Sequence, residues 1–426
     1  MQIGVYGSGY LGTVISACLA DFGMPVVCYD EDSSLVTAMA QGGMPFHEKN
    51  LKEIIRRSVR TGRLSYSTDI EAFVKKAHVI FMATDSPRYV EDITVRIAAM
   101  AVKEAVLVLA TPVPVGTATR IEKRLKSEGT KIAVVSQPVF VTDGCAIEDF
   151  NWPDRIVLGT DSPDAVLTLK QIYRPVVMRG VPVIVTNHET AEMVREASTA
   201  FLATKISFIN ELASLCESVS ADAVDLALAL GLDKKISPRC LQPGARFGGS
   251  FVEADMDSLA QLASGNGVSL KILSAAREVN RTLSDRIVEK ISHAVESLAG
   301  KQVAILGLAF KPHTNSVAGS GSIALAKHLM SEGAKVRAYD PVAIKEAQAE
   351  LSSAVCYCDS PYAAAEGGDA LVVGTGWPEF RALDFEKIKG LLKRPLIVDT
   401  KNLLDAARLR AMGFQYVGVG RGSSVL

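Results

Sequence analysis

Short apolar runs alternate with helix-length segments through the first 190 residues, and this alternation constrains the fold more than any other feature of the chain. The runs read QIGVYG, PVVCYD, HVIFMAT, AVLVLAT and KIAVVSQP. Continuous apolar runs of this length are typical of strands that are buried on both faces. Because parallel strands need a long crossover that is usually a helix, the pattern predicts a parallel sheet covered by helices.

The pattern changes after the first 190 residues and then returns. From about Glu189 to Leu230 the apolar residues recur at helical spacing, which predicts one long helix. Further helices are expected from Phe251 to about Leu298. The alternation resumes at Lys301, where the apolar runs are KQVAILGLAF, KVRAYDP, AVCYCD, ALVVGTG and PLIVDTK. We therefore expect a second α/β region there.

A chain of 426 residues is too long for one hydrophobic core and suits two or three domains. We predict an α/β protein with two Rossmann-like parallel-sheet domains, joined by a long central helix and a helical dimerisation region. The predicted boundaries are 1–190 for the first sheet domain, 191–300 for the helical region and 301–426 for the second sheet domain.

Composition argues against several classes of partner and site. The formal net charge of −1 gives no broad attraction to nucleic acid or to a membrane surface. No apolar run approaches the ~20 residues needed to span a bilayer, and no signal peptide is recognised before the first strand. The seven scattered cysteines favour reduced thiols in a cytoplasmic protein, and the six dispersed histidines suggest no metal site.

A glycine-rich turn follows the first predicted strand and opens a helix. Its glycines permit a tight turn and bring backbone N–H groups close to a pyrophosphate, which the positive end of the helix also attracts. Asp30 closes the next strand, where an acid binds the ribose 2′-OH and repels a 2′-phosphate, so NAD is favoured over NADP. The alternative is a glycine turn that serves packing alone. The predicted cofactor contacts in this motif are Gly7, Gly9, Tyr10, Leu11, Gly12 and Asp30.

Several stretches in order along the chain resemble one family. They read GSGYLGTV, GRLSYSTD, TPVPVGT, AEMVREASTAFLATKISFINELASLCE, GARFGGS, LGLAFKP, VRAYDP and VDTKNLLD. Together they resemble the UDP-glucose/GDP-mannose dehydrogenase family, the nucleotide-sugar 6-dehydrogenases. The resemblance implies an NAD domain, a central helical dimerisation region and a C-terminal domain that helps to bind UDP or GDP. We expect a nucleotide sugar as ligand, a UDP-sugar rather than a GDP-sugar, and a homodimer.

The family's catalytic cysteine has no counterpart in this chain. Members oxidise a sugar CH₂OH to a carboxylate with two NAD, and the second oxidation passes through a thiohemiacetal on a cysteine after Gly-Gly-Ser. The resemblance places Phe251 at that cysteine and Ala254 at the family's lysine, whereas Asp255 is retained as a base. The first of two family glutamates becomes Val139, and the second becomes Asp143, which remains an acid.

Further departures fall on the central helix and on the cofactor side. The family's lysine and asparagine, four residues apart on one helix face, stabilise an alkoxide, and they correspond here to Arg195 and Thr199. An arginine keeps its charge but gives up no proton at working pH. The family threonine of STVPVG falls at Pro112, with Thr111 adjacent. We add Thr84 and Thr111 to the predicted cofactor contacts.

The residues that correspond to the sugar-nucleotide site are partly retained. Lys311 matches a family lysine near the nucleotide sugar, and Lys401 and Lys235 replace arginines, which keeps the charge but loses the bidentate fork. A third family arginine becomes Ala318. Arg246 adds a guanidinium beside the sugar pocket. The predicted substrate contacts are Phe140, Lys235, Arg246, Phe247, Gly248, Gly249, Lys311 and Lys401.

Structural roles compete with these assignments. For Arg246 the alternative is a solvated loop position, for Asp255 an N-cap of the helix that begins near it, and for Asp143 turn chemistry alone. Arg195 has possible ion-pair partners in Glu192 and Glu196.

Three functional hypotheses follow. The chain transfers one hydride without a thiolate, or it binds NAD and a nucleotide sugar without catalysis, or its pocket takes a different, acidic ligand through Arg246.

Overall fold

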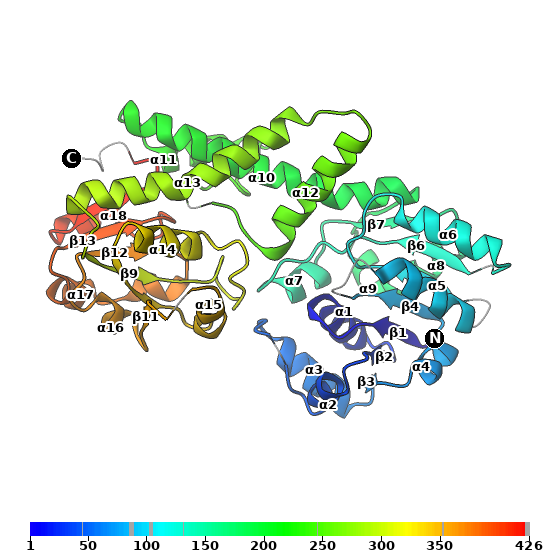
Figure 1. Cartoon of the computed structure of the whole chain (residues 1–426). Helices are drawn as coiled ribbons and strands as arrows, with labels where there is room; N and C mark the ends of the chain where they lie inside the picture. The colour runs from blue at the N-terminus through cyan, green and yellow to red at the C-terminus, as the bar shows by residue number, and fades with distance from the viewer. Residues whose placement is uncertain are drawn as a thin grey trace. The chain divides into compact units, whose positions relative to one another are not determined.

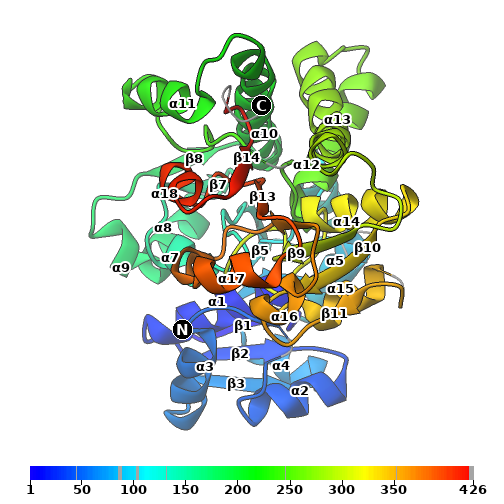
Figure 2. The same ribbon diagram turned by 90° about the vertical axis from the view of Figure 1, so that its left-hand side faces the viewer.

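The computed structural model describes residues 1–44, 46–84, 89–101, 105–130, 132–244, 246–351 and 353–421, without the side chains of Ser250 and Phe251. The chain divides into two compact units, Met1–Ala197 and Ser198–Leu426. Each unit is built around one sheet, as Figures 1 and 2 show.

The first unit contains an eight-stranded sheet with the order β3-β2-β1-β4-β5-β6-β7-β8. Its strands are β1 (Ile3–Tyr6), β2 (Val26–Tyr29), β3 (Leu64–Ser67), β4 (Val79–Met82), β5 (Val106–Leu109), β6 (Ala133–Ser136), β7 (Ile156–Gly159) and β8 (Val183–Thr186). All neighbours are parallel except β6 and β7, which meet antiparallel at Ser136 and Gly159. The chain order reverses between β1 and β4, and ligands of such sheets bind at the carboxyl ends of the strands near this point.

Helices cover both faces of this sheet. They are α1 (Tyr10–Asp21), α2 (Ser33–Ala40), α3 (Leu51–Arg60), α4 (Ile70–Lys76), α5 (Val90–Met100), α6 (Thr117–Ser127), α7 (Ala146–Asn151), α8 (Pro163–Ile172) and α9 (Arg174–Val177). Alternate residues of β4 enter different cores: Phe81 packs with α1, whereas Ile80 packs with α5 and α6. The continuous apolar runs of the sequence are therefore explained by burial on both faces, as predicted.

The predicted long helix is divided in two. α10 (His188–Ser218) begins in the first unit and ends in the second, and α11 (Ala223–Leu232) follows it. The prediction of one helix from 189 to 230 is therefore wrong after Ser218, where α10 ends. Ser220 adopts a left-handed φ of 59°, and the carboxylate of Asp222 accepts hydrogen bonds from Val224 N and Asp225 N, so a new helix starts there.

The second unit combines helices with a six-stranded parallel sheet of order β11-β10-β9-β12-β13-β14. Its strands are β9 (Gln302–Leu306), β10 (Lys335–Tyr339), β11 (Cys356–Tyr357), β12 (Ala370–Val373), β13 (Leu396–Asp399) and β14 (Gln415–Gly418). Its further helices are α12 (Ser250–Gly265), α13 (Lys271–Val295), α14 (Gly321–Ser331), α15 (Ile344–Glu350), α16 (Pro361–Ala365), α17 (Phe385–Leu391) and α18 (Ala406–Ala411). α13 packs against α14, which lies on this sheet (Figure 1). The predicted class, α/β with two sheets and a helical region between them in sequence, is confirmed.

Neither a membrane-crossing helix nor a metal cluster is found in the described part of the chain. None of its helices combines the length and the apolar character that a bilayer span requires. Nor do the described ranges bring together three or more His, Cys, Asp or Glu side chains in a position to hold a metal ion.

Candidate active site

The turn after β1 has no room for side chains at two of its glycines. Gly7 has a left-handed φ of 101°, and a Cβ there would lie 2.6 Å from the carbonyl oxygen of Ala83. A Cβ at Gly12 would lie 1.9 Å from the carbonyl oxygen of Gly7. Because α1 begins at Tyr10, directly after Gly9, the turn presents backbone N–H groups at the positive end of a helix. This geometry fits the pyrophosphate of a dinucleotide.

Asp30 lies beside this turn, immediately after β2. Its Oδ2 accepts hydrogen bonds from Ser8 N at 2.7 Å and from Ser8 Oγ at 2.8 Å, and its Oδ1 accepts one from Asp32 N at 3.0 Å. A carboxylate can accept about four hydrogen bonds. The carboxylate of Asp30 can therefore also accept one from a ribose hydroxyl. The sequence-predicted glycines and acid are thus adjacent, and together they fit NAD.

Glu48 connects the glycine-rich turn to a second turn, and the sequence did not single it out. Its side chain is 3% exposed. Oε2 accepts hydrogen bonds from Tyr10 Oη and from Gly144 N, both at 2.6 Å, and Oε1 accepts one from Ala146 N at 3.0 Å. Glu48 therefore ties the first residue of α1 to the turn that carries the buried Asp143.

A small cavity lies at the carboxyl ends of β5 and β6, where the start of α10 approaches. Its lining includes Thr111, Pro112, Ser136, Gln137, Pro138, Glu192, Arg195 and Glu196. Thr111 Oγ1 donates to the carbonyl oxygens of Met82 at 3.1 Å and of Thr84 at 3.0 Å. The structure thus brings Thr84 and Thr111 together, and it places Arg195 in the same cavity as Thr111.

The carboxylate of Glu192 binds backbone N–H groups at the start of α6. Its carboxylate accepts hydrogen bonds from Gly116 N at 2.6 Å, from Ala118 N at 2.9 Å and from Ser136 Oγ at 3.3 Å. Burial raises the pKa of Glu192 above its ordinary value. This acid therefore caps a helix and fixes the first turns of α10.

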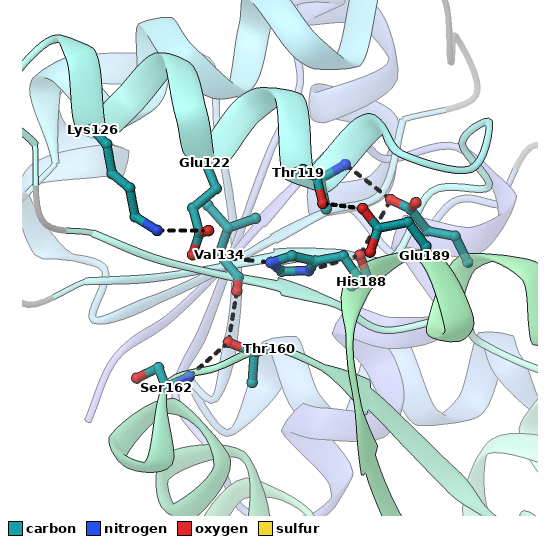
Figure 3. Close-up of polar contacts among 11 residues, drawn as sticks. Thr119, Glu122, Lys126, Val134, Thr160, Ser162, His188 and Glu189 are labelled. Carbon is teal, nitrogen blue, oxygen red and sulfur yellow. Dashed lines mark hydrogen bonds and ion pairs between the residues drawn. The ribbon is translucent and has the colours of Figure 1, made fainter.

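A second set of contacts joins the same two helices (Figure 3). Thr119 Oγ1 of α6 donates to Glu189 Oε1 of α10 at 2.5 Å, and His188 Nε2 lies 4.0 Å from Glu122 Oε1. The first two residues of α10 are thereby held to α6, as Figure 3 shows for His188 and Glu189. The helix that carries Arg195 has a fixed starting point in the first unit.

Phe140 follows the end of β6, and its ring contacts a neighbouring arginine. The guanidinium of Arg155 lies 4.0 Å from the centre of the Phe140 ring. A cation–π contact of this kind holds the ring in place. The structure therefore gives Phe140 a packing partner in addition to its predicted substrate contact.

Two of the predicted catalytic residues meet in the second unit. Thr199 Oγ1, on α10, donates a hydrogen bond of 2.9 Å to Asp255 Oδ2. Asp255 is 5% exposed and lies inside α12, whose N-cap is Gly249. The N-cap interpretation of Asp255 is therefore wrong, because a residue on the second turn does not occupy the cap.

The glycines before α12 fit closely against a neighbouring segment. A Cβ at Gly248 would lie 2.1 Å from the carbonyl oxygen of Gly319, and Gly249 has a left-handed φ of 108°. Gly249 N donates to the carbonyl oxygen of Ala318 at 3.0 Å. Arg246 Nη2 is paired with Glu253 Oε1 at 2.9 Å, so its charge already has a partner.

The three predicted lysines lie in different surroundings. Burial lowers the pKa of Lys401 to about 8, and its carbonyl oxygen accepts a hydrogen bond of 3.3 Å from Gln242 Nε2. Lys311 Nζ lies 5.9 Å from the centre of the Phe310 ring. The side chain of Lys235 is exposed. Lys401 is therefore joined to the segment before α12, to which Lys235 itself belongs.

Comparison with protein families assigns nearly the whole chain. Residues 1–177 match the NAD binding domain of the UDP-glucose/GDP-mannose dehydrogenase family, residues 189–282 its central domain and residues 304–406 its UDP binding domain. The UDP-glucose 6-dehydrogenase of Rhizobium meliloti is 36% identical over 99% of this chain and 100% of its own length. The UDP-glucose 6-dehydrogenase TuaD of Bacillus subtilis is 37% identical over 99% of this chain and 93% of its own.

Solved structures agree with this assignment. A UDP-glucose dehydrogenase from Pyrobaculum islandicum has a TM-score of 0.88 at 30% identity, with 98% of this chain and 97% of that chain covered. A UDP-D-ManNAc dehydrogenase from Pyrococcus horikoshii has a TM-score of 0.86 at 24% identity, over 99% of this chain and 100% of that chain, and it shows the shared fold.

Proposed function

Because the chain belongs to the UDP-glucose/GDP-mannose dehydrogenase family, we propose that it oxidises a hydroxyl group of a UDP-sugar to a carbonyl group by one hydride transfer. NAD, bound at the turn from Gly7 to Gly12, supplies the hydride acceptor. The match of residues 304–406 to a UDP binding domain, and the names of the relatives, support a UDP-sugar as substrate.

The observation that carries the proposal is the combination of an intact dinucleotide turn with Phe251 after Gly-Gly-Ser. A phenyl ring has no nucleophilic atom, so the covalent intermediate that leads to a carboxylate has no site at this position. Ala254 likewise offers no ammonium group. A single oxidation needs a cofactor site, residues that align the substrate with the cofactor, and a proton acceptor. The chain keeps candidate residues for each of these.

We assign the proton acceptor to Asp255. In the proposed step the C–H and O–H bonds of the carbinol break and a C=O bond forms, while the hydroxyl proton passes to a carboxylate oxygen of Asp255. The hydroxyl of Thr199 holds that carboxylate in one orientation through its hydrogen bond of 2.9 Å. Arg195, at the position of the family lysine, keeps its positive charge and does not exchange a proton.

The test is the stoichiometry of NADH formation with UDP-glucose. One NADH for each sugar, together with a carbonyl product that hydroxylamine traps, is the expected result. Two NADH and a uronic acid would contradict the proposal. Binding of UDP-glucose with no NADH would favour a non-catalytic binding protein. Failure of UDP-sugars, with binding of a carboxylate compound, would favour an acidic ligand at Arg246.

We also propose that two copies associate through the helical segment of the predicted division, residues 191–300. Phe201, Phe208 and Leu215 recur at every seventh residue of α10 and are 66%, 52% and 56% exposed. Residues at this spacing share one helix face. A continuous stripe of large apolar side chains favours a second copy of the same stripe as its cover. Phe208→Glu should convert a dimer to a monomer in analytical ultracentrifugation, and a monomeric wild-type protein would contradict the assignment.

A further inference from the structure

A segment without regular structure joins α11 to α12 and carries several of the predicted substrate contacts. It runs from Asp233 to Gly249, and its described residues form neither helix nor strand. Backbone groups of this segment are held by side chains from other elements of the second unit. Those side chains are Lys205, Asn210, Asn280 and Asn402.

Lys205, on α10, contacts three backbone groups of this segment. Its Nζ donates hydrogen bonds to the carbonyl oxygens of Ile236 at 2.9 Å, Ser237 at 3.2 Å and Arg239 at 2.7 Å. An ammonium group has three protons, and three backbone acceptors surround this one. Lys205 therefore binds three carbonyl groups within the four-residue stretch 236–239.

The backbone at Ser237 and Cys240 adopts a conformation that these residues disfavour on their own. Ser237 has a φ of 67° and Cys240 a φ of 61°, and the left-handed region is unfavourable for a residue with a Cβ. Ser237 also precedes Pro238, whose ring favours an extended conformation in the residue before it. The contacts of Lys205 with the carbonyl groups on both sides of Pro238 supply a reason for this conformation.

The rest of the segment is fixed by three asparagines. Gly244 N donates to Asn210 Oδ1 at 2.9 Å, and Asn402 Nδ2 donates to the carbonyl oxygen of Pro243 at 3.3 Å. Phe247 N donates to Asn280 Oδ1 at 2.8 Å. These amides hold residues 243–247, which lead into α12. Lys205 holds residues 236–239, which follow Lys235.

We propose that Lys205 is a positioning residue for the nucleotide sugar. It sets the conformation of residues 236–239 and, through them, the position of Lys235. This inference rests on the proposed function, because Lys235 is among the residues assigned to the UDP-sugar. Lys205 touches no reacting atom in this scheme, since its protons are directed to the three carbonyl oxygens.

Lys205→Met tests the proposal, with UDP-glucose and NAD as separate probes in titration calorimetry. UDP-glucose should bind about tenfold more weakly, as expected from the loss of hydrogen bonds to a charged group, and the affinity for NAD should not change. Ser237→Gly in the same chain should restore part of the UDP-glucose affinity, because glycine adopts the left-handed conformation without the Cβ penalty. Lys271→Met, at an exposed lysine that begins α13, is the matched control and should bind both ligands normally.

A Lys205→Met protein that binds UDP-glucose as tightly as the wild type would overturn the inference, whatever its melting temperature. An equal loss of affinity for both ligands would also overturn it, because it would show general destabilisation. Lys205→Arg keeps the charge on a planar group and should give an intermediate UDP-glucose affinity even where the methionine variant does not fold. A wild-type protein that does not bind UDP-glucose would instead refute the proposed function.

Discussion

Thr199 and Asp255 form a hydrogen bond of 2.9 Å between a helix of the central region and the helix that follows the Gly-Gly-Ser segment. The carboxylate is 5% exposed, so its orientation depends on the donors around it. The family resemblance implies an asparagine at the position of Thr199, and a threonine hydroxyl is likewise a hydrogen-bond donor. The pair is thus a defined polar contact between two of the proposed catalytic residues.

Asp255→Asn should lower the rate of NADH formation by about 10²–10⁴, the usual contribution of a positioned general base. Thr199→Val removes only the hydrogen bond and should lower the rate by about tenfold. The measurement is NADH formation at saturating UDP-glucose and NAD, with the affinity for NAD determined separately. An Asp255→Asn protein with the wild-type rate would show that another group accepts the proton.

Asp30→Ala should weaken NAD binding by at least about tenfold. The change removes the acceptor for Ser8 N and Ser8 Oγ, and it removes the acid assigned to the ribose hydroxyls. Titration with NAD measures the effect, and titration with UDP-glucose is the control, since that ligand is assigned to other residues. Unchanged NAD affinity in this variant would be incompatible with the cofactor assignment.

Glu48→Ala should destabilise the protein by about 3 kcal/mol, because it leaves two buried N–H groups and a partly buried phenol without their acceptor. Tyr10→Phe removes one of these three bonds and should have an effect of about 1 kcal/mol. Urea unfolding followed by circular dichroism measures both. If Glu48→Ala were as stable as Tyr10→Phe, the two turns would not depend on this carboxylate.

Some of the predicted site residues that the structure places side by side are also near one another in the chain. Gly7, Gly12 and Asp30 belong to one strand–turn–helix–strand unit, so local spacing was enough to place them together. Arg246 was also identified, but its partner Glu253 depends on how the loop enters α12. Its proposed role as a ligand anchor therefore needs the ion pair to open.

The residues that the sequence missed act on distant backbone groups. Glu48 contacts residues 38, 96 and 98 positions away, and backbone N–H groups leave no signature in a sequence. Lys205 likewise binds carbonyl oxygens. The break between α10 and α11 was missed for a different reason: apolar residues continue at helical spacing through Ser220, although Asp222 is a favourable N-cap.

The affinity for UDP should fall as the pH rises through about 8, the value to which burial lowers the pKa of Lys401. Below this pH the ammonium group is charged and attracts phosphate, and above it the neutral amine does not. A decrease of several-fold is expected between about pH 7 and about pH 9, where one such group loses its proton. Lys401→Met should bind UDP more weakly at the lower pH and show a flatter profile. The same slope in both proteins would exclude Lys401 from the nucleotide site.

Phe251→Cys alone should not restore the formation of a uronic acid. A thiol at this position supplies a nucleophile, but Val139, Arg195 and Ala254 still replace groups that the family resemblance assigns to acid–base and alkoxide chemistry. The variant should therefore still give one NADH for each UDP-glucose.

A combined variant tests whether these positions act as a set. Phe251→Cys with Ala254→Lys, Arg195→Lys and Val139→Glu should approach two NADH for each sugar, whereas the same three changes without the cysteine should not. Product analysis by mass spectrometry separates the carbonyl compound from the acid. Full acid formation by Phe251→Cys alone would mean that the thiol was the one missing group, and that the other substitutions leave the second oxidation intact.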